Sequence, residues 1–445
     1  MKRILVLGAG RSSSVLIAYL LDHSGSNEWH TTVGDVSFEA AREKIGSSAH
    51  GEALRFDIRE SDESRKTIAS ADIVISLLPA NFHPAVALHC LETGKHFLTA
   101  SYVSPELKAM DQEVRKKGLL FLNECGLDPG IDHLSAMQMI DGIRSRGGEI
   151  SSFESFTGGL IAPDTDPENP WRYKFTWNPR NVVLAGQSTA RYLSEGQHKY
   201  IPYQQLFRRI TPIRIPGLGN YEGYVNRDSL QYIETYGLHG IASMLRGTLR
   251  HPGFCAAWDI LVQLGCCDDT YQMEGVSRMT HARFIDSFLP PMPGYNLVEE
   301  KLCLHFGLDK NSVQLAMLKW SGFFEETPIG VQSGSPARIL EHILARKWSL
   351  NEGDRDQVVM WHRLAYWLNG AKKEVQASLV ATGTDRVNTA MARTVGLPLG
   401  IATRLIASDK IQTRGVVVPT GEEFYRPILL ELAGYGIALN EWEVR

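Results

Sequence analysis

One short segment of the sequence gathers residues that could move protons. Residues 123–133 read NECGLDPGIDH and directly follow a strand-like run, so a fixed backbone would hold their side chains. Asp128 is the first candidate, although Asp-Pro-Gly is also a common structural turn and both interpretations stay open. A free aspartic acid titrates near 3.9, so without burial Asp128 would act by orientation or electrostatics and not as a base. Asp132 and His133 fit the first turn of a helix better than a catalytic role.

A glycine-rich segment near residue 10 could bind phosphate. Gly8-Ala9-Gly10-Arg11-Ser12-Ser13 lies between a strand-like run and a helical one, and it matches G-x-G-x-x-G except that Ser13 replaces the third glycine. In such a loop the glycines let backbone N–H groups approach a pyrophosphate at the positive end of a helix. The alternative is a glycine turn that only allows tight packing.

Asp35 stands about 20 residues beyond this loop, where an acidic residue accepts hydrogen bonds from the adenosine ribose of a dinucleotide. The loop and the acid together predict a dinucleotide-binding site. Because a carboxylate repels a 2′-phosphate, Asp35 favours NAD over NADP. A solvated loop acid is the alternative.

Two arginines in loop-like sequence could hold carboxylates. Arg227 lies in NRDS, residues 226–229, and Arg250 ends RGTLR, residues 246–250. The planar guanidinium binds a carboxylate through two parallel hydrogen bonds, so a substrate with several carboxylates would suit such a pair. A solvated or surface-paired arginine is the alternative for each.

The elements that must position these residues follow a βαβ rhythm in residues 1–124. Short runs of Val, Ile and Leu alternate with helical periods, which predicts an α/β fold with a Rossmann-like, doubly wound parallel sheet. One run, ADIVISLLP at 71–79, ends where such sheets hold their ligand. Leu77, Leu78 and Pro79 would then line the nicotinamide side, and an ordinary core strand is the alternative.

The rest of the chain shows two further patterns. Residues 125–253, together with about 347–387, predict a second α/β (α+β) domain that binds substrate. The helical pattern of about 254–346 predicts an all-helical insertion domain. The segment of about 388–445 includes a predicted helix over 389–407 and would return to the first domain.

Composition excludes several classes of protein. The net charge is −4 and no long basic run occurs, which argues against a nucleic-acid partner. The longest apolar runs are of strand length, far short of the roughly 20 residues that cross a bilayer, so we expect no membrane span. No signal-peptide pattern follows Met1, which predicts a cytoplasmic protein. The six cysteines lack zinc-site spacing, which favours free thiols and predicts no metal site.

Six motifs, in order along nearly the whole chain, resemble those of the glutamate-forming saccharopine dehydrogenases, also called saccharopine reductases. They are Ser101-Tyr102-Val103-Ser104-Pro105, GLDPGIDH at 126–133, GGLIAPDTDPENPWRYKFTW at 158–177, YVNRDS at 224–229, RGTLR at 246–250 and RTVGLP at 393–398.

This resemblance implies a Rossmann-like domain, an α/β domain that also forms a homodimer, and a helical domain, with the active site in the cleft between them. It implies oxidation of L-saccharopine at its secondary amine with NAD or NADP, and hydrolysis of the imine to L-glutamate and 2-aminoadipate 6-semialdehyde, or the reverse reaction. The reaction belongs to lysine metabolism by the aminoadipate route. Proton donors and acceptors are needed because hydride leaves only a neutral amine and water must then attack the imine.

The resemblance also implies roles for individual residues. The catalytic residues would be Asp128 and Tyr102. The substrate would be bound by Ser101, Tyr102, Asp128, Arg227, Thr248, Leu249 and Arg250. The cofactor would be bound by Gly8, Ala9, Gly10, Arg11, Ser12, Asp35, Asp57, Ile58, Leu78, Pro79, Gly126, Leu127, Pro129, Gly130, Ile131, Trp171, Arg172, Tyr173 and Lys174.

The sequence departs from the family pattern at two places. Thr157 stands where many relatives have a cysteine before paired glycines, and a threonine can relay a hydrogen bond but does not ionise as a thiol does. Residues 11–13 of the phosphate loop read Arg-Ser-Ser, where relatives have an aromatic residue and a valine or a similar residue. Both departures leave the reaction type standing and bear on rate and exact substrate. Two alternatives to this function stay open. One is a related imine-reducing synthase of the carboxynorspermidine or homospermidine type, against which Arg227 and Arg250 argue. The other is a non-catalytic NAD(H)-binding scaffold, against which the presence of Asp128, Tyr102 and both arginines argues.

Overall fold

The computed structural model describes residues 1–185, 187 and 189–444 of the 445-residue chain. Within these residues the chain divides into two compact units. The first comprises Met1–Glu149, Leu368–Ala371 and Leu379–Glu441; the second comprises Ile150–Trp367, Lys372–Ser378 and the segment that begins at Trp442.

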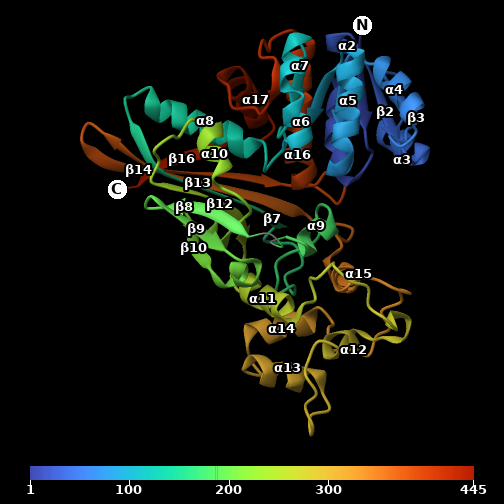
Figure 1. Cartoon of the computed structure of the whole chain (residues 1–445), viewed down its shortest axis with the longest axis vertical. Coiled ribbons are helices and arrows are strands. Elements are labelled where there is room, and N and C mark those ends of the chain that lie inside the picture. The colour runs from blue at the N-terminus through green and yellow to red at the C-terminus, as the bar shows by residue number, and fades with distance from the viewer. Residues whose placement is uncertain (186, 188, 445) are drawn as a thin grey trace. The chain divides into compact units, whose positions relative to one another are not determined.

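A seven-stranded sheet forms the core of the first unit, and its strands run in the order β15-β6-β5-β4-β1-β2-β3. Strands β2 and β3, at one end of this order, are drawn in blue in Figure 1. All the pairings along this order are parallel. Leaving β15 aside, the order 3-2-1-4-5-6 is that of a Rossmann fold, which confirms the predicted doubly wound sheet. The strands are β1 (Lys2–Leu7), β2 (Trp29–Asp35), β3 (Gly51–Arg55), β4 (Ile73–Ser76), β5 (His96–Thr99), β6 (Leu120–Leu122) and β15 (Gly415–Val417).

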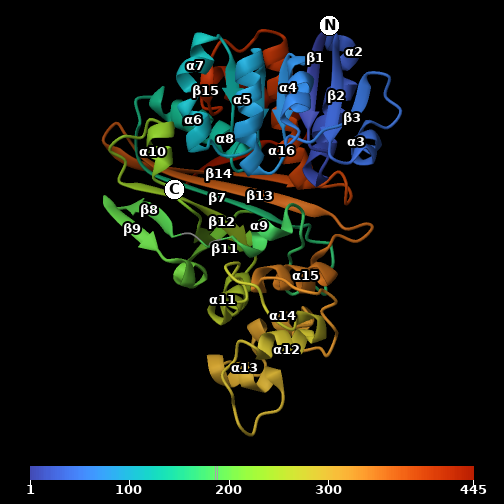
Figure 2. The same ribbon diagram turned by 45° about the vertical axis from the view of Figure 1, so that its right-hand side comes forward.

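Helices cover both faces of this sheet, which is why its central strands read as continuous apolar runs. Right-handed crossovers put successive helices on the two faces: α4 packs on α5, and α1 packs on α3. Figure 2 shows α4 and α5 side by side. The helices of this unit are α1 (Ser14–Asp22), α2 (Ser24–Asn27), α3 (Phe38–Ile45), α4 (Ser61–Ala69), α5 (His83–Thr93), α6 (Pro105–Ala109), α7 (Asp111–Lys116), α8 (Ile131–Arg144), α16 (Ala390–Ala407) and α17 (Glu422–Gly434), with short 3₁₀ turns η1 (Arg11–Ser13) and η2 (Ala80–Phe82).

The late helix α16 packs closely on α1, far from it in sequence. Thr389 caps α16 by accepting a hydrogen bond from the Ala392 N–H at 2.9 Å. The approach requires small residues, because a Cβ added at Gly396 would lie 2.7 Å from the backbone nitrogen of Leu16. The sequence after residue 388 therefore helps to build the first unit.

Residues 125–149, which the sequence places in the second domain, belong to the first unit. The physical reason is twofold. The segment after β6 is hydrogen-bonded to the last residue of β5, from the Cys125 N–H to the Thr99 carbonyl oxygen at 3.2 Å. Helix α8 packs on α17, and the Tyr425 hydroxyl donates to the Asp141 carboxylate at 3.0 Å.

A nine-stranded mixed sheet organises the second unit, in the order β10-β11-β12-β7-β13-β14-β16, with β8 paired to β12 and β9. Strands β7 and β12 are parallel, whereas β10, β11 and β12 are antiparallel. The strands are β7 (Glu149–Ile161), β8 (Ala190–Ser194), β9 (Gln197–Ile201), β10 (Ile210–Ile215), β11 (Gly219–Val225), β12 (Ser243–Arg250), β13 (Asp356–Leu368), β14 (Ala371–Thr382) and β16 (Leu439–Val444).

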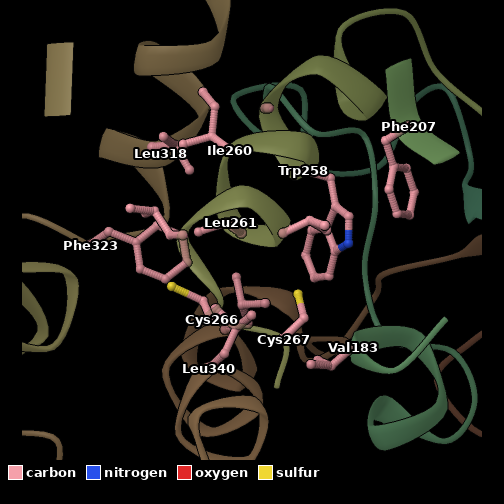
Figure 3. Packing of buried hydrophobic residues seen from close by; sticks show 14 of the residues in the cluster. Val183, Phe207, Trp258, Ile260, Leu261, Cys266, Cys267, Leu318, Phe323 and Leu340 are labelled. Carbon is pink, nitrogen blue, oxygen red and sulfur yellow. The ribbon is translucent and has the colours of Figure 1, made fainter. Parts of the chain in front are cut away.

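The chain between β12 and β13 is helical and is part of the second unit. Its apolar residues share one core cluster with residues that precede β12, such as Trp171, Val183 and Phe207. Trp258 and Leu261 of α11 meet Leu318 of α14 and Leu340 of α15 in this core (Figure 3). Cys266 lies in the same cluster, and all six cysteines of the chain are free and buried. The helices and turns of this unit are α9 (Pro179–Val183), η3 (Tyr203–Arg208), α10 (Gln231–Thr235), α11 (Phe254–Leu264), η4 (Val276–Arg278), α12 (His281–Asp286), α13 (Val298–Phe306), α14 (Val313–Trp320) and α15 (Pro336–Trp348).

The contact between α16 and α1 can be tested with Gly396→Ala. The new methyl group gains up to about 1 kcal/mol of helix propensity but overpacks the interface by about 1–3 kcal/mol, so we expect a net loss of stability. Gly142→Ala on α8 is the matched control, because no atom lies within 4 Å of its added Cβ. Urea unfolding should place the midpoint of Gly396→Ala below that of the wild type and that of Gly142→Ala at or above it. Equal midpoints for the two variants would contradict the close contact.

Candidate active site

The glycine-rich loop joins β1 to α1 at the point where the strand order of the first sheet reverses. Gly8 has φ +106°, and a Cβ there would lie 3.1 Å from the carbonyl carbon of Leu77, so the position requires glycine. No atom lies within 4 Å of a Cβ added at Gly10. The backbone is thus open to a close-approaching group at the start of a helix, which is the geometry that a pyrophosphate needs.

Asp35 ends β2 and contacts this loop directly. One carboxylate oxygen accepts a hydrogen bond from the Ala9 N–H at 2.7 Å, and the other accepts from the Ser37 N–H at 2.9 Å. The side chain is only half-buried, so its charge also faces solvent at the loop. The acid predicted to contact a ribose therefore also holds the phosphate loop in shape.

The other predicted cofactor residues of the first unit differ in exposure and in whether their polar groups are already bonded within the protein. Ser13, in place of the third glycine, is buried and donates to the Gly10 carbonyl oxygen at 2.8 Å. The Asp57 carboxylate forms an ion pair with Arg59 at 2.6 Å, and this hydrogen bond lowers the pKa of Asp57 to about 2. Arg11 and Pro79 are exposed, Ser12 and Leu78 are half-buried, and Ile58 is buried.

The segment with Asp128 folds into a tight turn before α8. The Gly126 N–H donates to the Pro129 carbonyl oxygen at 3.0 Å. Gly130 has φ +148°, and its neighbours leave no room for a Cβ. The buried Asp132 accepts a hydrogen bond from the Gly130 N–H at 2.6 Å, which supports the interpretation of Asp132 as a helix-start residue. Asp128 itself is half-buried at the open side of the turn.

A buried Glu124–His133 pair, which sequence reasoning did not single out, ties this turn to the Ser101–Val103 segment. Glu124 Oε2 lies 2.9 Å from His133 Nε2, and Glu124 Oε1 accepts from the Val103 N–H at 3.1 Å. The Glu124 N–H also donates to the Ser101 carbonyl oxygen at 3.0 Å. Ser101 and Tyr102 are therefore held next to the segment that carries Asp128.

His83 is a second group that the sequence did not reveal. Its Nδ1 lies 2.9 Å from Ser76 Oγ and its Nε2 lies 2.8 Å from Ser101 Oγ. The side chain is 2% exposed, and burial lowers the pKa of the imidazole to about 4. A lone histidine at the start of a helix gave no sequence signal, because its partners lie on two other elements.

In the second unit, Arg250 ends β12 as a buried cation. It is 5% exposed, and its guanidinium carbon lies 4.9 Å from the ring centre of Tyr173 and 5.1 Å from that of Phe254. Nη1 donates to the Leu249 carbonyl oxygen at 2.9 Å, whereas Nε has no hydrogen-bond partner among the described residues. Burial, together with Arg172 and Arg250, lowers the pKa of His251 to about 4. This region thus concentrates positive charge.

The remaining predicted substrate residues lie on neighbouring strands or after them. Thr248 of β12 is paired with Tyr224 of β11 and with Thr157 of β7, whose hydroxyl is buried without a hydrogen-bond partner. Leu249 is fully buried. Arg227 follows β11 in a left-handed conformation with φ +53° and an exposed side chain.

Two residues predicted to contact the cofactor are engaged within the second unit. The fully buried Trp171 donates from Nε1 to the Met317 carbonyl oxygen at 2.9 Å. The ammonium group of Lys174, which is also fully buried, lies 2.7 Å from Asp354 and 2.8 Å from Asp166. These contacts give both residues a structural role, and their contact with the cofactor stays a prediction.

Among the described residues, no group of His, Cys, Asp and Glu side chains is arranged to hold a metal ion. None of their helices is both long and apolar enough to pass through a bilayer.

The Rossmann sheet, its open glycine loop and the acid at the end of β2 define a dinucleotide-binding oxidoreductase. Two family models match the chain: the saccharopine dehydrogenase NADP binding domain over residues 4–122 and the saccharopine dehydrogenase C-terminal domain over residues 126–437. The chain belongs to the saccharopine dehydrogenase family.

Individual relatives agree with this assignment. The saccharopine dehydrogenase [NADP(+), L-glutamate-forming] of Schizosaccharomyces pombe is 32% identical over 99% of both chains. The mitochondrial alpha-aminoadipic semialdehyde synthase of Bos taurus is 33% identical over 98% of this chain, which spans 47% of that protein's length.

Solved structures give the same result. Apo saccharopine dehydrogenase (L-Glu forming) of Saccharomyces cerevisiae covers 100% of both chains with a TM-score of 0.89 and 31% identity. The homospermidine synthase of Legionella pneumophila, solved with NAD, matches with a TM-score of 0.55 at 11% identity, which shows a shared fold alone.

The neutral state of His83 predicts a measurable acid sensitivity. Its folded pKa lies below the value of about 6.5 expected in the unfolded chain, so as the pH falls the unfolded chain binds a proton that the folded chain does not. Between pH 7.5 and 5, the wild type should lose about 2 kcal/mol more unfolding free energy than His83→Asn. Urea titrations of both proteins at each pH measure the difference, and parallel pH profiles would contradict a neutral His83.

Proposed function

We propose that this chain oxidises L-saccharopine at its CH–NH bond, releasing L-glutamate and 2-aminoadipate 6-semialdehyde and reducing a nicotinamide dinucleotide. The same site would run the reverse reaction, and the reaction belongs to lysine metabolism by the aminoadipate route. Sequence similarity over the full length to relatives that are named for this reaction supports the proposal.

The observation that carries the proposal is the buried guanidinium of Arg250. A buried cation is costly unless an anion pairs with it, and its free Nε can donate to one. Saccharopine carries three carboxylates, which supply such an anion. A polyamine substrate would instead bring positive charge toward this region, and a non-catalytic scaffold would have no use for an unpaired buried charge. Both alternatives are therefore disfavoured.

Two side chains of the first unit could assist the reaction at the substrate nitrogen. We propose that the Asp128 carboxylate stabilises the positive charge that develops on the substrate nitrogen as hydride leaves, with Tyr102 as its hydrogen-bonding partner. The hydrogen bonds of Glu124 keep the two segments that carry these residues together. A bound nicotinamide supplies the hydride acceptor.

The substrate assignment is tested directly by mixing the protein with L-saccharopine and either NAD or NADP, while reduced nicotinamide is followed by absorbance and glutamate release by a separate assay. Turnover with stoichiometric glutamate is expected. Turnover only with an aldehyde and a polyamine in the reductive direction would favour the synthase alternative.

Arg250→Gln tests the observation that carries the proposal. Loss of a charged hydrogen bond to a carboxylate costs about 1.5–3 kcal/mol, so KM for saccharopine should rise about 10- to 100-fold while KM for the dinucleotide stays within a factor of two. Arg208→Gln is the matched control, because Arg208 is an exposed arginine paired with Asp259 in the same unit. Equal effects of the two variants would overturn the role of Arg250.

We further propose that this chain prefers NAD, although the fungal relatives are named for NADP. The support is the Asp35 carboxylate beside the phosphate loop, whose charge would repel a 2′-phosphate. Homodimerisation and cytoplasmic location stay predictions of the sequence.

Asp35→Asn tests this preference, because it removes the charge and keeps an oxygen for the Ala9 N–H. The ratio of kcat/KM for NADP to that for NAD should rise about tenfold, equivalent to about 1.4 kcal/mol of removed repulsion. Asp111→Asn is the control and should leave the ratio unchanged, because Asp111 lies in the same unit, is paired with Arg115 and, like Asp35, accepts a backbone N–H, here from Val416. An unchanged ratio in Asp35→Asn would show that the acid does not discriminate between the cofactors.

A further inference from the structure

The hydroxyl of Thr157, on β7, is a buried polar group that the rest of the second unit does not satisfy. The side chain is 7% exposed, and Oγ1 has no hydrogen-bond partner among the described residues. Most buried hydroxyls in proteins are hydrogen-bonded, because leaving one without a partner costs free energy. Such a hydroxyl is a candidate ligand contact where other ligand-binding groups lie beside it.

Strand alternation places Thr157 on the same face of the second sheet as Arg250. Thr157 is paired with Thr248 of β12, and Arg250 lies two residues further along that strand. The guanidinium carbon of Arg250 lies 5.9 Å from the ring centre of Tyr224, which is paired with Thr248 from the other side. Phe156, next to Thr157 in the sequence, points to the opposite face, where it belongs to a separate apolar cluster. The Thr157 hydroxyl and the Arg250 cation are therefore neighbours on one polar face.

The strands β7 and β12 approach each other closely beside Thr157. A Cβ added at Gly158 would lie 2.6 Å from the Leu249 carbonyl oxygen, so a larger residue there would push the strands apart. This contact fixes the spacing of the side chains on the polar face. Thr248 and Gly159, which flank Thr157, are only half-buried, so solvent reaches the edge of this face.

The charges near Thr157 decide which ligand suits it. Arg250 Nε also has no partner among the described residues. Glu222, paired with Arg250 across β11 and β12, directs its carboxylate to the N–H groups of Gly253 and Cys255, at 2.7 Å and 3.0 Å. The charge that is left to interact with a ligand is thus positive, and it attracts an anion. An ionised carboxylate only accepts hydrogen bonds, so the hydroxyl and Nε would both donate to it.

We propose that Thr157 is a substrate-binding residue whose hydroxyl donates to the same carboxylate that Arg250 binds. The proposal rests on the proposed function, because it adds a contact to that site and names the chemical class that this contact selects. One carboxylate of saccharopine would satisfy both groups at once, whereas an ammonium group would meet the positive charge of Arg250. Thr157 thereby favours acidic over basic substrates.

Thr157→Val removes the hydroxyl and keeps the shape of the side chain. Loss of one hydrogen bond to a carboxylate should raise KM for saccharopine about tenfold and leave KM for the dinucleotide within a factor of two. Thr157→Ser keeps a hydroxyl and should stay within about threefold of the wild type. An unchanged KM in Thr157→Val, or an equal loss in Thr157→Ser, would overturn the proposal.

Stability separates ligand binding from support of the fold. Because the hydroxyl has no partner in the free protein, Thr157→Val should leave the urea midpoint unchanged or raise it. Thr31→Val is the matched control, because Thr31 on β2 is also a buried threonine whose Oγ1 has no partner among the described residues. It should behave alike in urea but leave KM for saccharopine unchanged. A lower midpoint for Thr157→Val, or a tenfold rise in KM for Thr31→Val, would contradict the proposal.

The double variant Thr157→Val/Arg250→Gln tests whether the two residues hold the same carboxylate. Side chains that bind one group are coupled, so adding Thr157→Val to Arg250→Gln should raise KM less than about threefold. A further tenfold rise would show that Thr157 acts on a different group, and the proposal would fail.

Binding of glutarate, a dicarboxylate without an amine, tests the inference without turnover. Calorimetric titration should give a dissociation constant about tenfold higher for Thr157→Val than for the wild type, and neither protein should bind 1,5-diaminopentane. Equal glutarate affinities, or no glutarate binding by the wild type, would overturn the inference.

These measurements distinguish failure of the inference from failure of the proposed function. A wild-type protein that binds glutarate more tightly than Thr157→Val but does not turn over saccharopine contradicts only the proposed function. A wild-type protein that turns over saccharopine with the same KM as Thr157→Val contradicts only the inference.

Discussion

Hydrogen bonds that continue past the carboxyl ends of β5 and β6 hold together what the first unit offers to chemistry. The Cys125 N–H bonds to the Thr99 carbonyl and the Glu124 N–H to the Ser101 carbonyl, so the two segments stay hydrogen-bonded beyond the last paired residues of the strands. The Glu124 side chain adds a bond to Val103 and a buried contact to His133. Because these groups are shielded from water, the bonds are strong and the loops have few alternative arrangements. The positions of Ser101, Tyr102 and Asp128 all depend on this constraint.

Two buried cations of the second unit differ in whether the protein itself supplies a counter-charge. Lys174 and Arg250 are both almost inaccessible to solvent, yet Lys174 lies between two carboxylates whereas Arg250 rests on aromatic rings with Nε unsatisfied. In the first arrangement two carboxylates balance the charge of the lysine, and these ion pairs stabilise the fold. The second leaves a guanidinium that a ligand carboxylate would complete, and it is the more informative of the two for function.

The cofactor question shows how one side chain can serve two purposes. Asp35 accepts hydrogen bonds from two backbone N–H groups, one of them in the phosphate loop, so it supports the loop whichever dinucleotide binds. One family model and the fungal relatives are named for NADP, whereas the charge of this half-buried carboxylate beside the loop is the basis for the NAD preference proposed above.

The sequence by itself determined the Rossmann sheet, the phosphate loop, the helix near residue 390 and the family, because each depends on local periodicity or on short motifs whose members are close in sequence. Only the tertiary structure decided that residues 125–149 belong to the first unit and that Trp171 and Lys174 are internally engaged. It also decided that His83 and Glu124 are hydrogen-bonded to Ser101, and that His133 contacts Glu124. Those facts depend on partners from separate strands and helices, and on whether a charge finds its counter-charge inside the protein. No single stretch of sequence contains that information, since burial and pairing arise only when distant segments meet.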